Sequence, residues 1–266
     1  IRLPARPTLD HHGLNALHRA HRLAIPFDSL DVALGRAIAI DSTSVFAKLV
    51  TARRGGYCFE HDRLFADALA ALGFAARPLL ARVWLGQPDF TGEAPPLTHT
   101  LSLVTAEGQD WIADPGFGGS YVPPMPLADR AEATATDGAR FVLHADERHG
   151  WTVWRDGDPG TADGRARDAG LQPQYSFTLA RVEPSDLALG NHWAATHPDS
   201  RFVQHRIVSI VLPHGFARLT DRHYRRQVGA EVSEGEIIDP RVYRMRLSLM
   251  FGIDLTQEEV AGLSLF

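Results

Sequence analysis

The chain of 266 residues holds a single cysteine, Cys58, and the residues around it are those expected of a reactive thiol. It stands in the segment RGGYCFE, over 54–60. The two glycines before it allow a sharp turn and a close approach of the backbone to a ligand. The apolar pattern after it predicts a helix that starts near Cys58, and a helix N-terminus favours an anion such as a thiolate. We therefore expect a nucleophile rather than an inert buried thiol.

Charged residues flank this thiol on both sides. Arg53 and Arg54 precede it and could add positive potential that favours the thiolate, or they could form a solvated helix end. Glu60 follows it, and its negative charge would oppose the thiolate unless Glu60 pairs with an arginine. We interpret Glu60 as a structural residue.

A nucleophilic cysteine needs a base, and among 13 histidines His99 is the candidate. In the segment LTHTLSLV, over 97–104, the alternation places His99 on the same strand face as two leucines. A histidine on an apolar face needs a polar partner there. By contrast, we expect His18 and His21 to lie on a polar helix face. No carboxylate pattern completes a metal site with them, so we interpret them as solvated or structural residues.

The next strand offers the partner that His99 needs. If residues 106–109 form a hairpin loop, Thr105 pairs with Asp110, and Asp114 lies one diagonal step from His99 on the same face. Diagonal neighbours are about 7–8 Å apart, within reach of two inward side chains. Asp114 could then accept the imidazole N–H and stabilise the imidazolium. The alternative is a buried His–Asp pair without chemistry, but a reactive cysteine elsewhere favours a triad.

A glycine-rich segment, PGFGGS over 115–120, follows this aspartate directly. Backbone N–H groups of Gly116, Gly118 and Gly119 could hold a phosphate or pyrophosphate. A simple turn between strands is the alternative, and the segment alone does not decide between them.

Helices and then strands must position these residues. The periodicity predicts helices over 9–24, over 41–54 and from Cys58 to a stop at Gly73. Strands are predicted over 77–85, 97–105, 110–114, 140–145, 151–156 and 175–182. A helix over 184–197, strands over 202–213 and 217–228, and a final helix over 239–252 complete the pattern. Such a meander suggests a small barrel or a strongly curved sheet.

Composition excludes several classes of protein. The net charge of −5 argues against a nucleic-acid binder, and the longest apolar runs, such as 207–212, are too short to span a bilayer. No charged-then-apolar leader opens the chain, so we expect no secretion signal, and native residues could precede Ile1. One cysteine fits a reducing cytoplasm and cannot build a Cys₂ or Cys₄ zinc site. We expect a cytoplasmic protein without a metal.

Five segments in order resemble the arylamine N-acetyltransferase family. They are HRLAIPFDSLDV (21–32), RGGYCFE (54–60), THTLSLV (98–104), ADPGFGG (113–119) and DSRFVQHRIVSIVLPHGFARLTDR (199–222). The resemblance covers most of the chain and is weakest over about 120–180. It implies an α+β fold with a papain-like Cys–His–Asp core. Its parts would be a helical bundle over 1–83, a β-barrel over 84–183, and an interdomain helix with an α/β lid over 184–266.

The resemblance also implies the activity and the roles of residues. The reaction would be acetyl transfer from acetyl-CoA to an arylamine or arylhydrazine, with Cys58 as nucleophile, His99 as base and Asp114 as the residue that orients it. Aromatic residues would contact the substrate, and the glycines of the loop would contact the coenzyme. The substrate-binding candidates are Phe27, Tyr57, Trp84, Phe117 and Phe202, and the cofactor-binding candidates are Gly116, Gly118 and Gly119. A homodimer is left open.

Three other activities fit the same residues. An amide synthase that closes macrolactam rings would share the triad, and so would a protease-like or transglutaminase-like cysteine hydrolase. The third alternative is a catalytically silent binding protein that keeps the fold.

Overall fold

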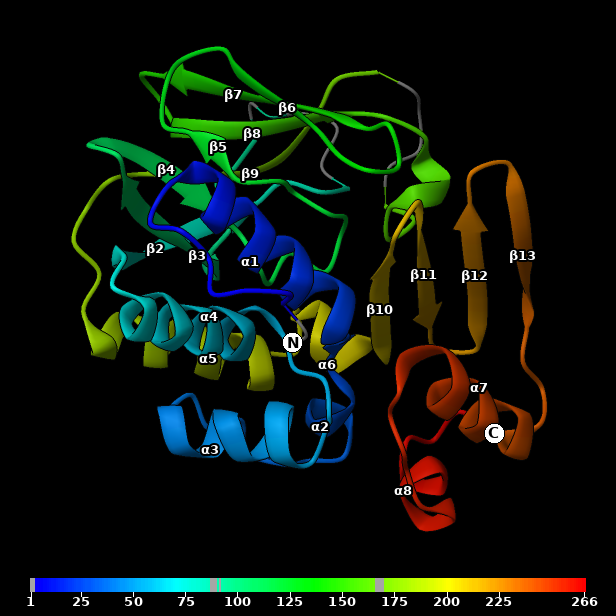
Figure 1. The fold of residues 1–266 in the computed structure, drawn as a ribbon. Coiled ribbons are helices and arrows are strands. Elements are labelled where there is room, and N and C mark those ends of the chain that lie inside the picture. Colours follow the sequence, from blue (N-terminus) through cyan, green and yellow to red (C-terminus); the bar gives the residue numbers. More distant parts are fainter. Residues whose placement is uncertain (1–2, 87–89, 91, 166–169) are drawn as a thin grey trace.

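The computed structural model describes residues 3–86, 90, 92–165 and 170–266. Two antiparallel sheets and a layer of helices make up this part of the chain. In Figure 1 the larger sheet curls above the helices α4 and α5, and the smaller sheet stands beside them. The C-terminal helices α7 and α8 lie below the smaller sheet.

The N-terminal part is helical, as its periodicity predicts. Its elements are α1 (His11–Ala24), β1 (Phe27–Asp28), α2 (Leu30–Ala33), α3 (Ser42–Phe46), a π-helical turn (Ala47–Thr51) and α4 (Cys58–Leu72). The Asp10 side chain caps α1 by accepting the Gly13 N–H at 2.7 Å. Gly73 ends α4 with a φ of 104°, in the left-handed region that glycine adopts without strain. The helix predicted over 41–54 therefore begins as α3 and ends as the π-helical turn.

The larger sheet has eight strands in the order β5-β4-β3-β2-β9-β8-β7-β6. They are β2 (Ala75–Val83), β3 (Leu97–Ala106), β4 (Gln109–Ala113), β5 (Met125–Pro126), β6 (Ala131–Thr134), β7 (Arg140–Asp146), β8 (Gly150–Asp156) and β9 (Gln172–Phe177). Its end strands β5 and β6 contact each other, so the sheet nearly closes around an apolar interior. Hence it forms the barrel-like sheet that the sequence predicts. A 3₁₀ turn (Pro159–Thr161) follows β8.

Two details of the strand prediction for this sheet are wrong. The strand predicted over 175–182 ends at Phe177, because Arg77 binds the carbonyls of Leu179 and Ala180 with its guanidinium in place of a ladder. Strands β5 and β6 were not predicted, since two and four residues are too few for a period to register.

The C-terminal part begins with α5 (Pro184–Thr196) and α6 (Arg201–Gln204). The smaller sheet has the order β1-β10-β11-β12-β13, and α7 and α8 pack against it. These elements are β10 (Ile207–Leu212), β11 (Gly215–Thr220), β12 (His223–Val228), β13 (Glu231–Glu236), α7 (Pro240–Phe251) and α8 (Gln257–Gly262). The prediction of one strand over 217–228 is wrong, because the chain turns at Asp221, whose φ is 51°. The strand predicted over 202–213 starts later, since α6 occupies its first residues.

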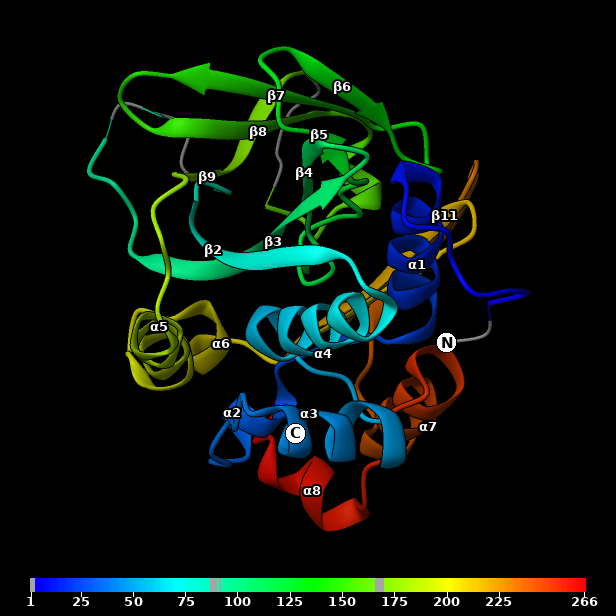
Figure 2. The same ribbon diagram turned by 60° about the vertical axis from the view of Figure 1, so that its left-hand side comes forward.

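The helical layer and the barrel meet along α4 and β3. Figure 2 shows α4 running beneath β2 and β3. The hydroxyls of Thr100 and Ser102 donate to the buried Asp62 carboxylate of α4 at 3.2 and 2.7 Å. Both faces of β3 are therefore covered, one by the barrel interior and the other by α4. Across the described ranges, the helices are too short or too polar to cross a membrane.

Candidate active site

Cys58 is the first residue of α4 and is 2% exposed. Gly56 forms a parallel bridge with Phe27, and its carbonyl accepts the Asp28 N–H at 2.8 Å. These contacts fix the start of α4 beside β1. The thiol Sγ lies 3.7 Å from the carbonyl oxygen of Thr98, on β3. The sulfur therefore sits at a helix N-terminus, where an anion is favoured.

His99 and Asp114 form a buried pair next to this thiol. His99 Nε2 lies 2.7 Å from Asp114 Oδ2, and both side chains are 3% exposed or less. The register is the predicted one, since β3 and β4 pair Ser102 with Ala113 directly before Asp114. Because Asp114 occupies Nε2, Nδ1 is the ring nitrogen left for Cys58, a hydrogen-bond partner of the ring. The three residues expected to form a triad are thus brought together.

The electrostatics of the pair favour its charged form. Burial alone would lower the pKa of His99, but the Asp114 carboxylate and the contact with Cys58 outweigh it and raise that pKa to about 10. Burial would likewise raise the pKa of Asp114, yet the His99 imidazolium holds it below its usual value. At neutral pH the pair is therefore imidazolium and carboxylate.

The loop after Asp114 is held from both ends. Asp114 Oδ1 accepts the Gly116 N–H at 3.1 Å. The Arg22 guanidinium of α1, 2% exposed, donates to the carbonyls of Pro115 at 3.0 Å and Phe117 at 2.9 Å. Helix α1 thus fixes the loop that carries Asp114.

The glycines of this loop are required by close packing. A Cβ on Gly116 would lie 2.6 Å from the Cα of Cys58, and one on Gly118 would lie 2.7 Å from the ring of Phe27. Such distances are shorter than real Cβ contacts. Together with Gly119, both glycines line the hollow described next, so they are placed where a ligand could reach them. Contact with coenzyme A stays a prediction for all three.

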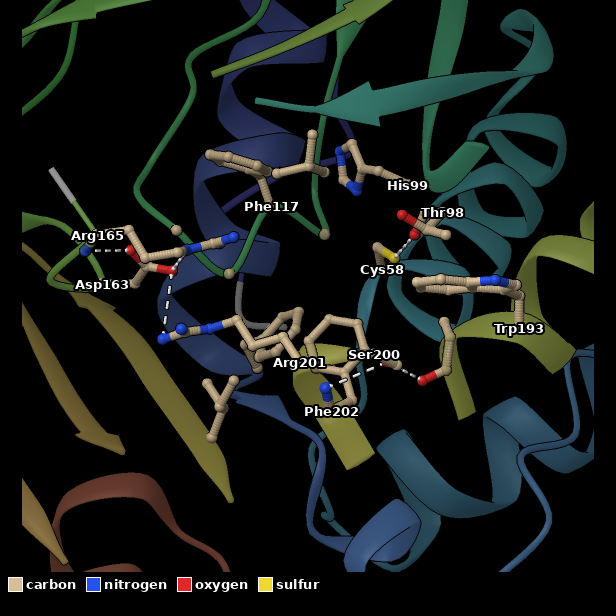
Figure 3. Close-up of a pocket in the computed structure, with 17 residues that line it drawn as sticks. Cys58, Thr98, His99, Phe117, Asp163, Arg165, Trp193, Ser200, Arg201 and Phe202 are labelled. Carbon is tan, nitrogen blue, oxygen red and sulfur yellow. Dashed lines mark hydrogen bonds and ion pairs between the residues drawn. The ribbon is translucent and has the colours of Figure 1, made fainter. Parts of the chain in front are cut away.

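A hollow with a volume of about 100 Å³ opens at Cys58 and His99. This is smaller than the roughly 300–1,000 Å³ typical of sites for drug-sized ligands. Three of the predicted aromatic residues, Phe27, Phe117 and Phe202, line it. Figure 3 shows Phe117 and Phe202 on opposite walls.

Two other aromatic candidates lie elsewhere. The described lining of the hollow does not include Tyr57 or Trp84. Tyr57 is buried under Phe202, with ring centroids 5.3 Å apart. Trp84 is fully buried and donates its indole N–H to the Ser176 hydroxyl at 2.8 Å. Both indirectly support the walls of the barrel and pocket instead of facing the hollow.

Three charged residues and one tryptophan of the lining were not anticipated from the sequence. They are Asp163, Arg165, Trp193 and Arg201. Asp163 and Arg165 fall in the stretch where the family resemblance is weakest, so no motif marked them. Arg201 directly precedes the predicted residue Phe202, and this adjacency in the sequence could have indicated that Arg201 lines the site.

The charges around α4 form a separate network. Lys48 Nζ lies 2.7 Å from Glu60 and 2.8 Å from Asp31, and the Arg54 guanidinium lies 3.1 Å from Asp31 and 3.2 Å from Asp28. Glu60 is structural, as expected, but its partner is a lysine rather than an arginine. Burial raises the pKa of Glu60 to about 7, although Lys48 opposes this. Arg54 is paired with carboxylates, so its positive charge is not free to favour the thiolate form of Cys58.

The expectation that His18 and His21 lie on a polar helix face is wrong. Both are at most 1% exposed, because they share a face of α1 with Leu14 and Leu17 that packs against α4 and the barrel. His21 Nε2 contacts His61 Nδ1 at 2.8 Å. In the part of the chain that the structure describes, no group of three or more His, Cys, Asp or Glu could hold a metal.

The chain is similar to known proteins over most of its length. The model of an N-acetyltransferase family matches residues 10–260. The arylamine N-acetyltransferase / N-hydroxyarylamine O-acetyltransferase of Salmonella typhimurium is 39% identical over 250 residues, which are 93% of this chain and 83% of that protein. The chain belongs to the arylamine N-acetyltransferase family.

Solved structures of the family have the same fold. The arylamine N-acetyltransferase structure from Salmonella typhimurium superposes with a TM-score of 0.87, at 33% identity, and covers 99% of this chain and 94% of its own. A Mycobacterium marinum member in complex with CoA superposes with a TM-score of 0.84 at 26% identity, covering 96% and 94%. The expected family and its α+β fold are thus confirmed.

Proposed function

We propose that this protein transfers an acetyl group from acetyl-CoA to an arylamine or arylhydrazine through an acetyl-Cys58 intermediate. The observation that carries the proposal is the thiol of Cys58 in the lining of a hollow, beside a His99–Asp114 pair in which His99 Nε2 lies 2.7 Å from Asp114 Oδ2. The names of the related arylamine N-acetyltransferases support the same substrate class.

In the first half-reaction the Cys58 thiolate attacks the thioester carbonyl carbon of acetyl-CoA. A bond forms between Sγ and that carbon, and the bond to the coenzyme sulfur breaks. The His99 imidazolium gives its proton to the departing sulfur, so CoA leaves as a thiol and His99 becomes neutral. Backbone N–H groups at the start of α4 would stabilise the oxyanion, and one such donor is typically worth roughly 100–1,000-fold in rate.

In the second half-reaction the amine nitrogen attacks the acetyl-Cys58 carbonyl. Neutral His99 takes the amine proton, the bond from carbon to Sγ breaks, and the thiolate–imidazolium pair is restored. Aromatic amines suit this step because they are largely neutral at pH 7, whereas alkylamines must first lose a proton. Phe27, Phe117 and Phe202 offer an apolar lining for the aromatic ring.

Intact-mass analysis tests the intermediate. Acetyl-CoA without an acceptor should add the mass of one acetyl group, and Cys58→Ala should add none. Addition of an arylamine such as aniline should remove the adduct and yield the acetanilide. With both substrates varied, parallel double-reciprocal lines are expected, and intersecting lines would contradict the two-step scheme.

The same samples separate the alternatives. A cysteine hydrolase would consume acetyl-CoA at the same rate with and without arylamine. A macrolactam synthase would leave acetyl-CoA unused and require a carrier-bound acyl chain with an aromatic amine. A silent binding protein would show no adduct on Cys58 at all.

A further inference from the structure

Within the described ranges, the guanidinium of Arg22 is a buried cation whose hydrogen-bond partners are neutral. Arg22 lies in the last turn of α1 and is 2% exposed. Besides the carbonyls of Pro115 and Phe117, it donates to the carbonyl of Ser120 at 3.3 Å, and its Nε has no partner. Carbonyl dipoles alone compensate a buried charge poorly, so an anion must stabilise it from a longer distance.

That anion is Asp114, the residue directly before the loop that Arg22 binds. Burial lowers the pKa of Arg22 to about 10, and the charge of Asp114 opposes this fall. Burial would raise the pKa of Asp114, but the His99 imidazolium and, to a smaller extent, Arg22 hold it below its usual value. Arg22 therefore stays a cation at neutral pH, and Asp114 is a carboxylate that serves two cations.

The other ionisable groups nearby do not replace this cation. The groups that face Asp114 or Arg22 are His18 and His21 on α1, His61 and Asp62 on α4, His99 on β3, Tyr175 on β9, and Tyr121. Burial lowers the pKa values of the three histidines on helices and raises those of the two tyrosines, so all five are neutral at pH 7. Among the described residues, Arg22 is therefore the permanent cation that acts on Asp114.

The charges of the site change when Cys58 is acetylated. In the resting site the thiolate and the Asp114 carboxylate face two cations, the His99 imidazolium and Arg22. Acetylation removes the charge of the thiolate, and His99 passes its proton to the departing sulfur. Asp114 and Arg22 then remain, and their charges still balance. A proton that returned to the His99–Asp114 pair would add a positive charge near a buried cation, which is unfavourable.

We propose that Arg22 is a positioning residue whose fixed charge keeps the His99–Asp114 pair free of an extra proton once Cys58 is acetylated. His99 then stays neutral and can take the proton of the incoming amine. The proposal rests on the proposed function, because it concerns the second half-reaction. The hydrogen bonds to the loop hold the charge in place, since a planar guanidinium donates in fixed directions.

The pH dependence of deacetylation tests this role. Acetyl-Cys58 protein is formed with acetyl-CoA, freed of CoA by gel filtration and mixed with aniline, which is neutral from pH 6 to 9. Rapid quench then gives the rate of acetanilide formation. In Arg22→Gln the midpoint of the acid limb should lie about one unit higher than in the wild type, so the rate below it should be about 10-fold lower. Arg19→Gln removes an exposed arginine of the same helix and, as the matched control, should leave the midpoint unchanged.

Arg22→Lys separates the charge from the hydrogen bonds. Lysine keeps the charge but not the planar fork, so the rate should fall equally from pH 6 to 8 while the midpoint stays at the wild-type value. A uniform loss in Arg22→Gln without a shifted midpoint would make Arg22 a structural residue, and a shift in Arg22→Lys as large as in Arg22→Gln would do the same. If urea denaturation shows that Arg22→Gln is unfolded, the comparison of Arg22→Lys with the wild type still decides, because a shifted midpoint there overturns the proposal and an unchanged one supports it.

A second measurement does not require acetyl transfer. Iodoacetamide converts Cys58 into a neutral thioether, which has the same charge as the acetylated residue. Titration of the His99 ring nitrogens by NMR should then give a pKa about one unit higher in Arg22→Gln than in the wild type. If no acetyl-Cys58 forms but this shift is present, the proposed reaction fails and the role of Arg22 stands. If acetylation proceeds and the two pKa values are equal, the role of Arg22 fails alone.

Discussion

Replacing Asp114 by asparagine should switch off the charged state of the triad. The Asn side-chain oxygen can still accept the Gly116 N–H, so the loop keeps its anchor. Its amide nitrogen would then donate to His99 Nε2, which moves the ring proton to Nδ1. That tautomer cannot accept a proton from Cys58.

The size of the effect follows from the pKa of His99. This pKa lies near 10 in place of 6.5, chiefly because the Asp114 carboxylate outweighs burial. Since one pKa unit corresponds to about 1.4 kcal/mol, the carboxylate favours the imidazolium by an amount on the order of a few kcal/mol. Without the carboxylate, burial disfavours that cation, so we expect the ion-paired population at pH 7 to fall by about 100- to 1,000-fold.

Alkylation of Cys58 by iodoacetamide measures this population directly, because the thiolate is the form that reacts. In the wild type the rate should be nearly constant from pH 6 to about pH 9, below the raised pKa of His99. In Asp114→Asn the alkylation rate at pH 7 should be about 100- to 1,000-fold slower than in the wild type, and it should rise with pH. Asp110→Asn, the same change on the exposed part of the same hairpin, is the control. Equal rates and equal pH profiles for wild type and Asp114→Asn would refute this account of the pair.

Three further predictions concern stability and geometry. Gly116→Ala puts a Cβ 2.6 Å from the Cα of Cys58, so acetylation of the thiol should slow by about 100-fold in a rapid-quench assay, while a wild-type rate would show that the loop adapts. Burial lowers the pKa of His18 from 6.5 to about 4. As the pH falls, the unfolded chain therefore binds a proton at His18 before the folded chain does. The free energy of unfolding from urea titrations should therefore drop by about 2 kcal/mol from this residue between pH 7.5 and pH 5, and His18→Leu should lose that part of the pH dependence. Lys48→Met leaves the 2%-exposed Glu60 without its nearest cation. The free energy of unfolding from urea denaturation at pH 8 should therefore fall by about 3 kcal/mol, and no measurable fall would contradict this.

The reacting groups could be located from the sequence because local rules decide them. A two-residue turn at Glu107 and Gly108, both with positive φ, fixes the β3–β4 register, and that register places Asp114 beside His99. The two glycines before Cys58 and the apolar period after it predict the helix that starts at this residue. Each of these signals lies within about fifteen residues of the side chain that it positions.

The remainder of the hollow depends on contacts between distant segments. Arg165 follows β8 and Arg201 opens α6, and no period or spacing connects them across the chain. The burial of His18 is another such case. A histidine in a helix is expected to face solvent unless the elements that pack against that helix are known. Its place on the leucine face of α1 was visible in the spacing, but its polarity outweighed that signal.

The hydroxyl of Ser209, on β10, donates to the carbonyl of Gly118 at 3.1 Å, and Ser29 exchanges hydrogen bonds with Ile207. A chain emerging from the ribosome therefore presents its thiol long before the segment that closes the pocket has been made. The part of the pocket wall that β10 supplies is therefore synthesised well after the thiol and its His–Asp pair, so the complete pocket can form only during the last quarter of synthesis.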